Sequence, residues 1–173
     1  MKNIKIIGFL FFGLALWSCG SEDDGGPGYE IQYSSYKPVL MDTNELFKSI
    51  SFGGSRQINS KGKLIIDGNN LFVIEIDNGV HFYDNTNPSN PVETGFLTVP
   101  GCRDINLVKN VLYVSNSVDL VVIDISNPKN PVVGKRSRKV FTVSGSPDRL
   151  YIAPPYNKIP ANTVIVGWKK VTP

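Results

Sequence analysis

Histidine and cysteine are scarce in this chain of 173 residues, which contains one histidine and two cysteines. A zinc site takes three or four nitrogen or sulfur ligands, so we expect none. The lone histidine, His81, has no Gly-x-Ser-x-Gly segment to pair with, and it is interpreted as a surface or packing residue of a strand. Calcium-loop spacing such as Asp-x-Asp-x-Asp-Gly is missing too. The sequence therefore predicts a protein that is not an enzyme and holds no metal or cofactor.

An excess of charge and long hydrophobic runs are lacking as well. The chain has 18 Lys and Arg against 15 Asp and Glu, and this near-balance gives no reason to expect a nucleic acid partner. The apolar run at residues 6–17 is shorter than the roughly 20 residues that span a bilayer. Because Lys2 and Lys5 precede it and small Ser18 follows it, residues 1–18 are typical of a secretory signal peptide. A true membrane helix or a plain signal peptide is the alternative.

The first cysteine stands at the end of this run. Leu16-Trp17-Ser18-Cys19 resembles the lipobox of bacterial lipoproteins, although Trp17 is larger than the residue usual there. The resemblance implies that Cys19 is lipidated and anchors the protein to a membrane. Cys102 is then the remaining thiol, which excludes an intrachain disulfide. We expect Cys102 to be a small residue at a tight corner rather than a reactive thiol.

An acidic segment follows the cysteine. Ser21-Glu22-Asp23-Asp24 resembles the export signal of Bacteroidota lipoproteins, which implies a lipid-anchored protein of the outer membrane that faces the cell exterior. A solvated acidic linker is the alternative interpretation. Residues 25–28 are glycine-rich and favour a flexible spacer, so residues 19–28 are interpreted as a lipidated tether.

Two long segments of the chain repeat each other. Residues 81–95 (HFYDNTNPSNPVETG) match residues 121–135 (VVIDISNPKNPVVGK) at an offset of 40, and residues 68–73 match residues 109–114 at an offset of 41. A third copy starts at residues 146–152. Periods of this length are typical of solenoids and propellers. The structural repeat positions are Asp84, Pro88 and Pro91 in the first copy and Asp124, Pro128 and Pro131 in the second.

Each repeat predicts four short strands joined by turns. The predicted strands of the third copy include residues 141–144 and 150–152, followed by 164–168. Asn69, Asn110 and Asp148 are expected to hold unusual backbone angles in the first turn, and Asp77-Asn78-Gly79 is predicted to form an Asn-Gly hairpin turn. Asp84 and Asp124 are expected to accept backbone N–H bonds and fix the Asn-Pro turns that follow them.

The repeats resemble a known sequence family. The segments at 119–133 (DLVVIDISNPKNPVV) and 79–93 (GVHFYDNTNPSNPVE) resemble LVIVD repeats. These repeats are found in secreted bacterial proteins that are predicted to be β-propellers. Together with YKPVLM, NELFKSI and VIVGWKK, the two segments make residues 36–168 similar to one Bacteroidota lipoprotein group. The resemblance implies no activity.

The fold expected for residues 58–173 is all-β, an incomplete β-propeller-like array of antiparallel four-stranded blades. It holds about two and three-quarter repeats, whereas a closed propeller needs roughly four to eight blades. Two explanations account for the small number of repeats: the blade-like sheets form an open array, or the reading frame is truncated. Residues 29–57 are expected as an N-terminal extension, in which a capping box at residues 42–45 starts a short helix through Ile50.

Surface chemistry points to binding. The candidate contact residues are Lys135, Arg136, Arg138 and Lys139, which favour acidic glycans or lipid headgroups, or simply a charged sheet edge. Tyr29, Tyr33, Tyr36, Tyr156 and Trp168 are candidates for a sugar platform or for the core. The expected function is a surface-anchored interaction module with a protein or glycan partner. The alternatives are a structural subunit that completes a larger propeller or envelope assembly as an oligomer, and a glycan-active enzyme that uses the repeat aspartates.

Overall fold

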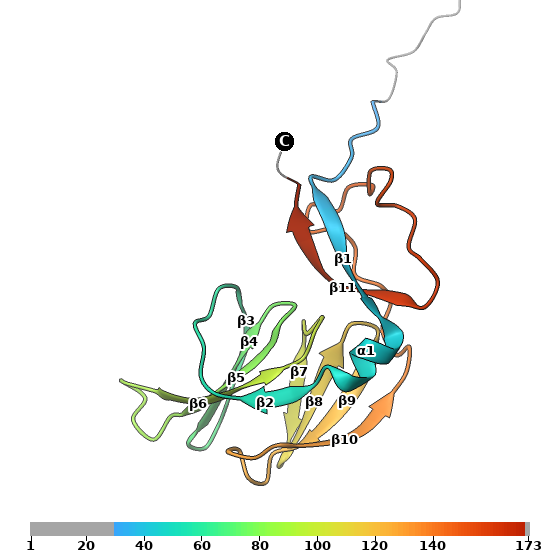
Figure 1. The fold of residues 1–173 in the computed structure, drawn as a ribbon. Coiled ribbons are helices and arrows are strands. Elements are labelled where there is room, and N and C mark those ends of the chain that lie inside the picture. Colours follow the sequence, from blue (N-terminus) through green and yellow to red (C-terminus); the bar gives the residue numbers. More distant parts are fainter. Residues whose placement is uncertain (1–29, 172–173) are drawn as a thin grey trace, which may run out of the picture. The chain divides into compact units, whose positions relative to one another are not determined.

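The computed structural model describes residues 30–171, and all of its strands belong to the unit that begins at Ile31. The described chain is all-β with antiparallel sheets, as predicted, and holds one short helix, α1 (Thr43–Lys48) (Figure 1). Three sheets form, of five, four and two strands. The two larger sheets correspond to the first and second sequence repeats, so each repeat folds as one blade-like unit.

The first sheet has the strand order β2-β6-β5-β4-β3. Its members are β2 (Ser51–Gly53), β3 (Lys61–Asp67), β4 (Asn70–Glu75), β5 (Gly79–Asp84) and β6 (Val92–Thr98). The last four are consecutive in the chain and pair as a meander, as the repeat predicted. Strand β2 comes from the expected N-terminal extension and adds to the edge of β6.

The second sheet has the order β10-β9-β8-β7. It consists of β7 (Ile105–Val108), β8 (Val111–Asn116), β9 (Asp119–Asp124) and β10 (Val132–Ser137). The pairing repeats that of the first sheet, since Leu112 lies opposite Ile123 here and Leu71 opposite Tyr83 there. This sheet carries the second repeat.

The hydrophobic core lies between the two large sheets. Phe72, Ile74, Val80 and Phe82 of the first sheet belong to one cluster with Leu112, Val114, Val121 and Ile123 of the second. The rings of Phe72 and Phe82 meet edge to face at 4.9 Å. Each such side chain contributes about 1.5–3 kcal/mol when it leaves water, so this cluster holds the two repeats together.

Burial differs between the sheets. In β4 and β5 of the first sheet, successive residues are buried on both faces. In β8 and β9 of the second sheet, buried and half-buried residues alternate for most of their length. Because side chains of a strand point alternately to opposite faces, the second sheet has one covered face and one partly open face.

The repeat aspartates fix turns, as expected. Asp84 Oδ1 accepts the Thr86 N–H at 2.9 Å, and Asp124 Oδ1 accepts the Ser126 N–H at 2.8 Å. Hydrogen bonds to Thr86 lower the pKa of Asp84, and hydrogen bonds to Ser126 lower the pKa of Asp124. Both carboxylates therefore serve the turn into the Asn-Pro segment.

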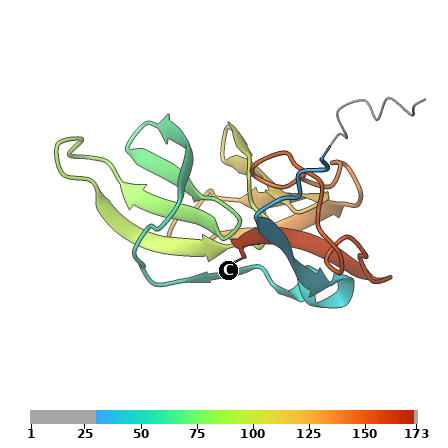
Figure 2. The same cartoon turned by 90° about the horizontal axis from the view of Figure 1, so that it is seen from above.

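The third repeat does not form the predicted hairpin. Residues 141–144 contain no strand, and within 150–152 a single bridge joins Tyr151 to Tyr33. Pro147, Pro154 and Pro155 lack the N–H that a ladder requires. Only the last strand, β11 (Thr163–Lys170), is present, and it pairs with β1 (Tyr36–Asp42) from the N-terminal extension. Figure 2 shows these two strands, blue and red, side by side although they are far apart in the sequence.

Two turn predictions were wrong in detail. The left-handed residues of the first turn in each repeat are Gly68, Lys109 and Arg149, not the neighbouring Asn69, Asn110 and Asp148. In the β4–β5 turn, Asp77 takes the left-handed conformation with φ of 66°, so no Asn-Gly turn forms. The cause is tertiary, because the Asp77 N–H donates to the Cys102 carbonyl at 2.8 Å.

Helix α1 connects β1 to β2 and ends at Lys48, two residues before the expected end. Asp42 caps it, since its side chain accepts the Asn44 N–H at 2.7 Å. Leu46 is buried on the inner side of the helix. Its carbonyl accepts a hydrogen bond from Arg136 of β10 at 3.3 Å, which fixes the helix to the second sheet.

Candidate functional site

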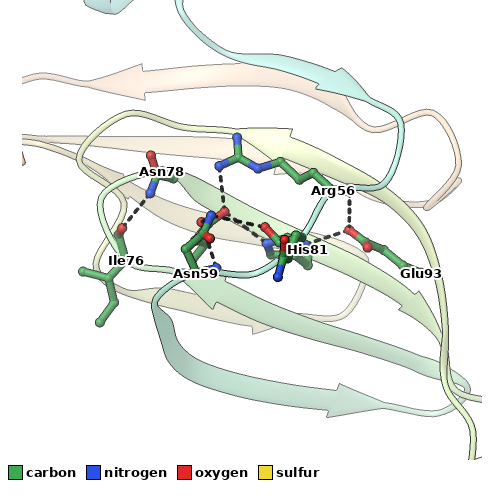
Figure 3. Close-up of polar contacts among 8 residues, drawn as sticks. Arg56, Asn59, Ile76, Asn78, His81 and Glu93 are labelled. Carbon is green, nitrogen blue, oxygen red and sulfur yellow. Dashed lines mark hydrogen bonds and ion pairs between the residues drawn. The ribbon is translucent and has the colours of Figure 1, made fainter.

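The most concentrated polar chemistry of the described chain surrounds its histidine. His81 is central in β5 and fully buried (0% exposed). Its Nδ1 lies 2.7 Å from Glu93 Oε1 of β6, and its Nε2 lies 3.2 Å from Glu75 Oε2 of β4 (Figure 3). The three side chains come from adjacent strands and share one face of the first sheet, the face away from the core. We call Glu75, His81 and Glu93 the polar triplet.

The connection between β2 and β3 closes over the polar triplet. Arg56 Nη2 contacts Glu75 Oε2 at 2.9 Å, and the Arg56 backbone N–H donates to Glu93 Oε1 at 3.3 Å. Asn59 donates to Glu75 Oε1 from its side chain at 3.2 Å and from its backbone at 3.3 Å. The guanidinium of Arg56 also lies over the Phe96 ring at 4.3 Å. This segment is therefore clamped onto the sheet by ionic and aromatic contacts.

The electrostatics of the triplet are those of a closed ionic cluster. Both ring nitrogens of His81 face carboxylate oxygens, and both can donate only when the ring is an imidazolium. Burial raises the pKa of Glu75, but hydrogen bonds from Asn59 and His81 and the charge of Arg56 outweigh it, so the pKa is lowered. The Arg56 guanidinium and the two Asn59 donors thus offset part of the cost of burying Glu75.

The triplet occupies positions that are uncharged in the other repeat. At the repeat offsets, Glu75 corresponds to Asn116, His81 to Val121 and Glu93 to Val133. The sequence predicted His81 to be a surface or packing residue, and the structure makes it a packing residue. Glu75, Glu93 and Arg56 were missed. The charged residues of the first repeat that stand where the second repeat has uncharged ones were a signal that could have found Glu75 and Glu93. Arg56 precedes the repeat and carries no such signal.

A cavity of about 240 Å³ lies where loops of both large sheets meet β11. Asp77 and Arg103 form a bidentate ion pair on its wall, with contacts of 2.7 and 3.0 Å. Trp168 of β11 and Phe141 supply aromatic surface. Ser117 Oγ donates to the Ile165 carbonyl at 2.7 Å, which ties β11 to the second sheet beside the cavity.

The candidate basic residues do not form one surface. The Arg136 side chain is only 17% exposed, since it contacts Asp119 at 3.0 Å and Asn116 at 2.6 Å. Lys135, Arg138 and Lys139 are exposed. The Arg138 guanidinium lies over the Phe47 ring at 4.9 Å. Arg136 thus serves the fold, and the other three remain accessible.

The remaining candidates are placed as follows. Pro88 and Pro91 lie in the β5–β6 connection, and Pro128 and Pro131 lie in the β9–β10 connection. Cys102 is fully buried at a corner, and burial, with the charges of Asp104 and Asp77, raises the pKa of its thiol. Such a thiol is a poor nucleophile. Cys19, with the signal peptide, the tether and Tyr29, lies outside the described residues.

Residues 30–171 show neither a metal cluster nor a membrane-spanning helix. No three His, Cys, Asp or Glu side chains there are arranged to hold a metal ion. None of the helical structure described is long and apolar enough to cross a membrane.

Comparison with known proteins identifies one repeat. Residues 102–136 match the family model of the LVIVD repeat. The matched range covers β7 to β10, so the repeat unit recognised in sequence coincides with the second sheet. No match was found between the chain and the curated proteins or the solved structures.

Proposed function

We propose that this protein is a non-catalytic interaction module, held at the cell surface by a lipid on Cys19, that binds its partner through the open face of the second sheet. This open face consists of four half-buried side chains on β8 and β9, namely Val111, Tyr113, Leu120 and Val122. Val108 and Val132, at 49% and 58% exposed, extend it at one end. This partly exposed apolar sheet surface is the observation that carries the proposal.

Comparison of the two repeats supports a binding role for the open face. At the repeat offsets, Tyr113, Leu120 and Val122 correspond to Phe72, Val80 and Phe82 of the first sheet. Those three are at most 1% exposed, because the second sheet covers them. The same kind of surface is thus buried in one repeat and open in the next. The partner that fits it best presents a flat apolar face of its own.

A binding role also agrees with how the polar side chains are used. Asp84 and Asp124 are occupied by their own turns, and the polar triplet is covered by the Arg56 segment. Cys102 is buried. These groups already serve the fold, which supports a non-catalytic assignment.

The experiment is site-specific photo-crosslinking on intact cells. A photoreactive amino acid replaces Tyr113 in the full chain, and the matched control places it at Leu64, which is 53% exposed on the edge strand β3 of the other sheet. We expect one discrete adduct from position 113 that is missing from position 64 and that Val122→Asp abolishes. Equal labelling from both positions, or no adduct from position 113, would overturn the proposal.

A second candidate function is a structural subunit that completes a larger propeller-like assembly. The observation in its favour is that the open face corresponds to a face that another blade-like sheet covers within this chain. The mass of the adduct separates the candidates. An adduct with a second copy, or with another chain that carries LVIVD repeats, indicates assembly, and any other protein indicates a receptor-like module.

The anchoring part of the proposal rests on the sequence of residues 1–28. A cleavable apolar run, the lipobox-like residues 16–19 and the acidic segment after them support an outer-membrane lipoprotein of Bacteroidota type that faces outward. Protease added to intact cells should then degrade the protein, whereas a protein that faces the periplasm would be protected until the outer membrane is permeabilised.

A further inference from the structure

The cavity beside β11 is formed by loops rather than by the open face. It is lined by the β4–β5 turn, the β6–β7 connection, Ser115 of β8, the β8–β9 turn, residues 141–144 and β11. None of the four residues on β8 and β9 that define the open face lines it. Converging loops on a rigid sheet scaffold are where binding residues usually lie. The cavity thus offers a second surface, which adjoins the open face at Ser115 but uses other residues.

Its polar groups are held in place. The Arg103 guanidinium is oriented by both carboxylate oxygens of Asp77. Asp104 Oδ1 accepts a hydrogen bond from Lys63 at 2.9 Å. Among the residues that the structure describes, Arg103 Nη1 and Asp104 Oδ2 make no hydrogen bond, so an oriented donor and an exposed acceptor remain for a ligand. The bidentate contact preorganises Arg103, which lowers the entropic cost of binding.

Its apolar groups are aromatic. Phe141 is 40% exposed, and Trp168 lies against the cavity from β11. The indole Nε1 of Trp168 is buried without a hydrogen-bond partner, and it is the one such side-chain atom in residues 30–171. Because this nitrogen is buried, Trp168 offers the cavity its ring rather than a hydrogen-bond donor.

The charges and the size restrict the ligand. Arg103 is paired with Asp77 and Asp104 with Lys63, so these four charges balance and an anion gains little here. A purely apolar ligand would leave Arg103 Nη1 and Asp104 Oδ2 unpaired. The volume, about 240 Å³, is below the roughly 300–1,000 Å³ of drug-sized sites. A small neutral ring with several hydroxyl groups meets all three conditions.

We propose that this cavity binds one sugar residue of a neutral glycan. The C–H face of the ring packs on Phe141 and Trp168, while neighbouring hydroxyls accept from Arg103 and donate to Asp104. This inference goes beyond the interaction function proposed above, because it uses other residues and another class of ligand.

The test is saturation-transfer NMR on the full chain in micelles of a detergent without a sugar headgroup. The probes are the methyl glycosides of glucose, galactose and mannose and N-acetylglucosamine, with glucuronate as the acidic comparison. We expect transfer to at least one neutral sugar and weaker transfer to glucuronate. Failure of every neutral sugar, or an equal signal from glucuronate, would overturn the proposal.

Variants locate the binding. Asp104→Asn changes an exposed carboxylate and Phe141→Ala an exposed ring, so both should fold. Each should weaken binding at least about fivefold, the equivalent of one lost hydrogen bond or ring contact. Tyr151→Ala, which removes a 76% exposed ring outside the cavity, is the matched control and should bind normally. Unchanged binding by both cavity variants would contradict the assignment, whereas crosslinking from position 113 would be unaffected by either.

Discussion

At the residue scale, the polar triplet shows how one repeat differs from its neighbour. Repeat proteins commonly alter the outer face of a terminal repeat to make it polar. Here Glu75, His81 and Glu93 stand where the second repeat has Asn116, Val121 and Val133, and the Arg56 segment covers them. The triplet is best understood as the closing surface of the first sheet.

This interpretation predicts a specific pattern of stabilities. His81→Val should destabilise the fold by about 3 kcal/mol, because it leaves the buried carboxylate of Glu75 and the largely covered carboxylate of Glu93 facing an apolar side chain. The triple variant Glu75→Asn, His81→Val, Glu93→Val installs the residues of the second repeat and should recover most of that loss. Denaturant titration followed by tryptophan fluorescence measures both. A triple variant less stable than His81→Val would contradict the interpretation.

We predict that the contact between Asp148 and the N-terminal residues Ser34 and Ser35 is sensitive to acid. Burial raises the pKa of Asp148, but hydrogen bonds from Ser34, Ser35 and Leu150 outweigh it and lower the pKa to about 2. Because the folded-state pKa lies below the ordinary value of 3.8, the stability from Asp148 is present above that value and is lost as pH falls toward 2.

We therefore expect Asp148→Asn to flatten the fall in unfolding free energy between about pH 4 and pH 2. Unfolding free energies of the variant and the parent chain at matched pH values measure this. Ser34→Ala, which removes the 2.8 Å hydrogen bond, should give an intermediate slope. Parallel curves for all three proteins would show that Asp148 has no such role.

At the element scale, the β4–β5 turn depends on Gly79. Its φ of +152° disfavours other residues, and an added Cβ would collide with the Leu97 carbonyl oxygen and lie 2.9 Å from the Val99 nitrogen. Gly79→Ala should therefore cost at least about 2 kcal/mol. Gly54→Ala is the matched control, since nothing lies within 4 Å of the place that its added methyl group would occupy. Thermal unfolding of both variants gives the comparison, and equal midpoints would refute the steric argument.

The pairing of β1 with β11 could not be predicted from the period of the repeats. The repeat predicted a third sheet of consecutive strands, but proline replaces ladder donors between residues 147 and 160. Strand β11 then lacks its own neighbours and pairs with a strand more than 100 residues earlier. Such pairing depends on which edges the rest of the fold leaves open.

At the scale of the whole molecule, the proposed lipid anchor holds the protein at the membrane, and the open face of the second sheet binds the proposed partner. We expect Cys19→Ser to release the protein from membranes. Each CH₂ group of a lipid chain that enters the bilayer contributes about 0.8 kcal/mol of binding free energy, and serine carries no such chain. Fractionation of cells into membrane and soluble pools measures this. Ser21→Ala is the control and should stay in the membrane pool. Membrane retention of Cys19→Ser would argue for a different anchor.

The sequence by itself determined the local architecture. The meander strands of the first two repeats, the aspartate turns before Asn-Pro and the tight corner at Cys102 all follow from short-range patterns. They could be predicted because alternation, proline and side-chain capping act within a few residues.

Only the tertiary structure decided what lies between distant residues. It made Asp77 rather than Asn78 the left-handed residue, buried His81 between two carboxylates, turned Arg136 inward and brought β11 to β1. It also left one face of the second sheet open and enclosed the cavity beside Trp168. Each depends on which surfaces meet after the sheets stack, and that is a property of packing between segments that no single stretch of the sequence contains.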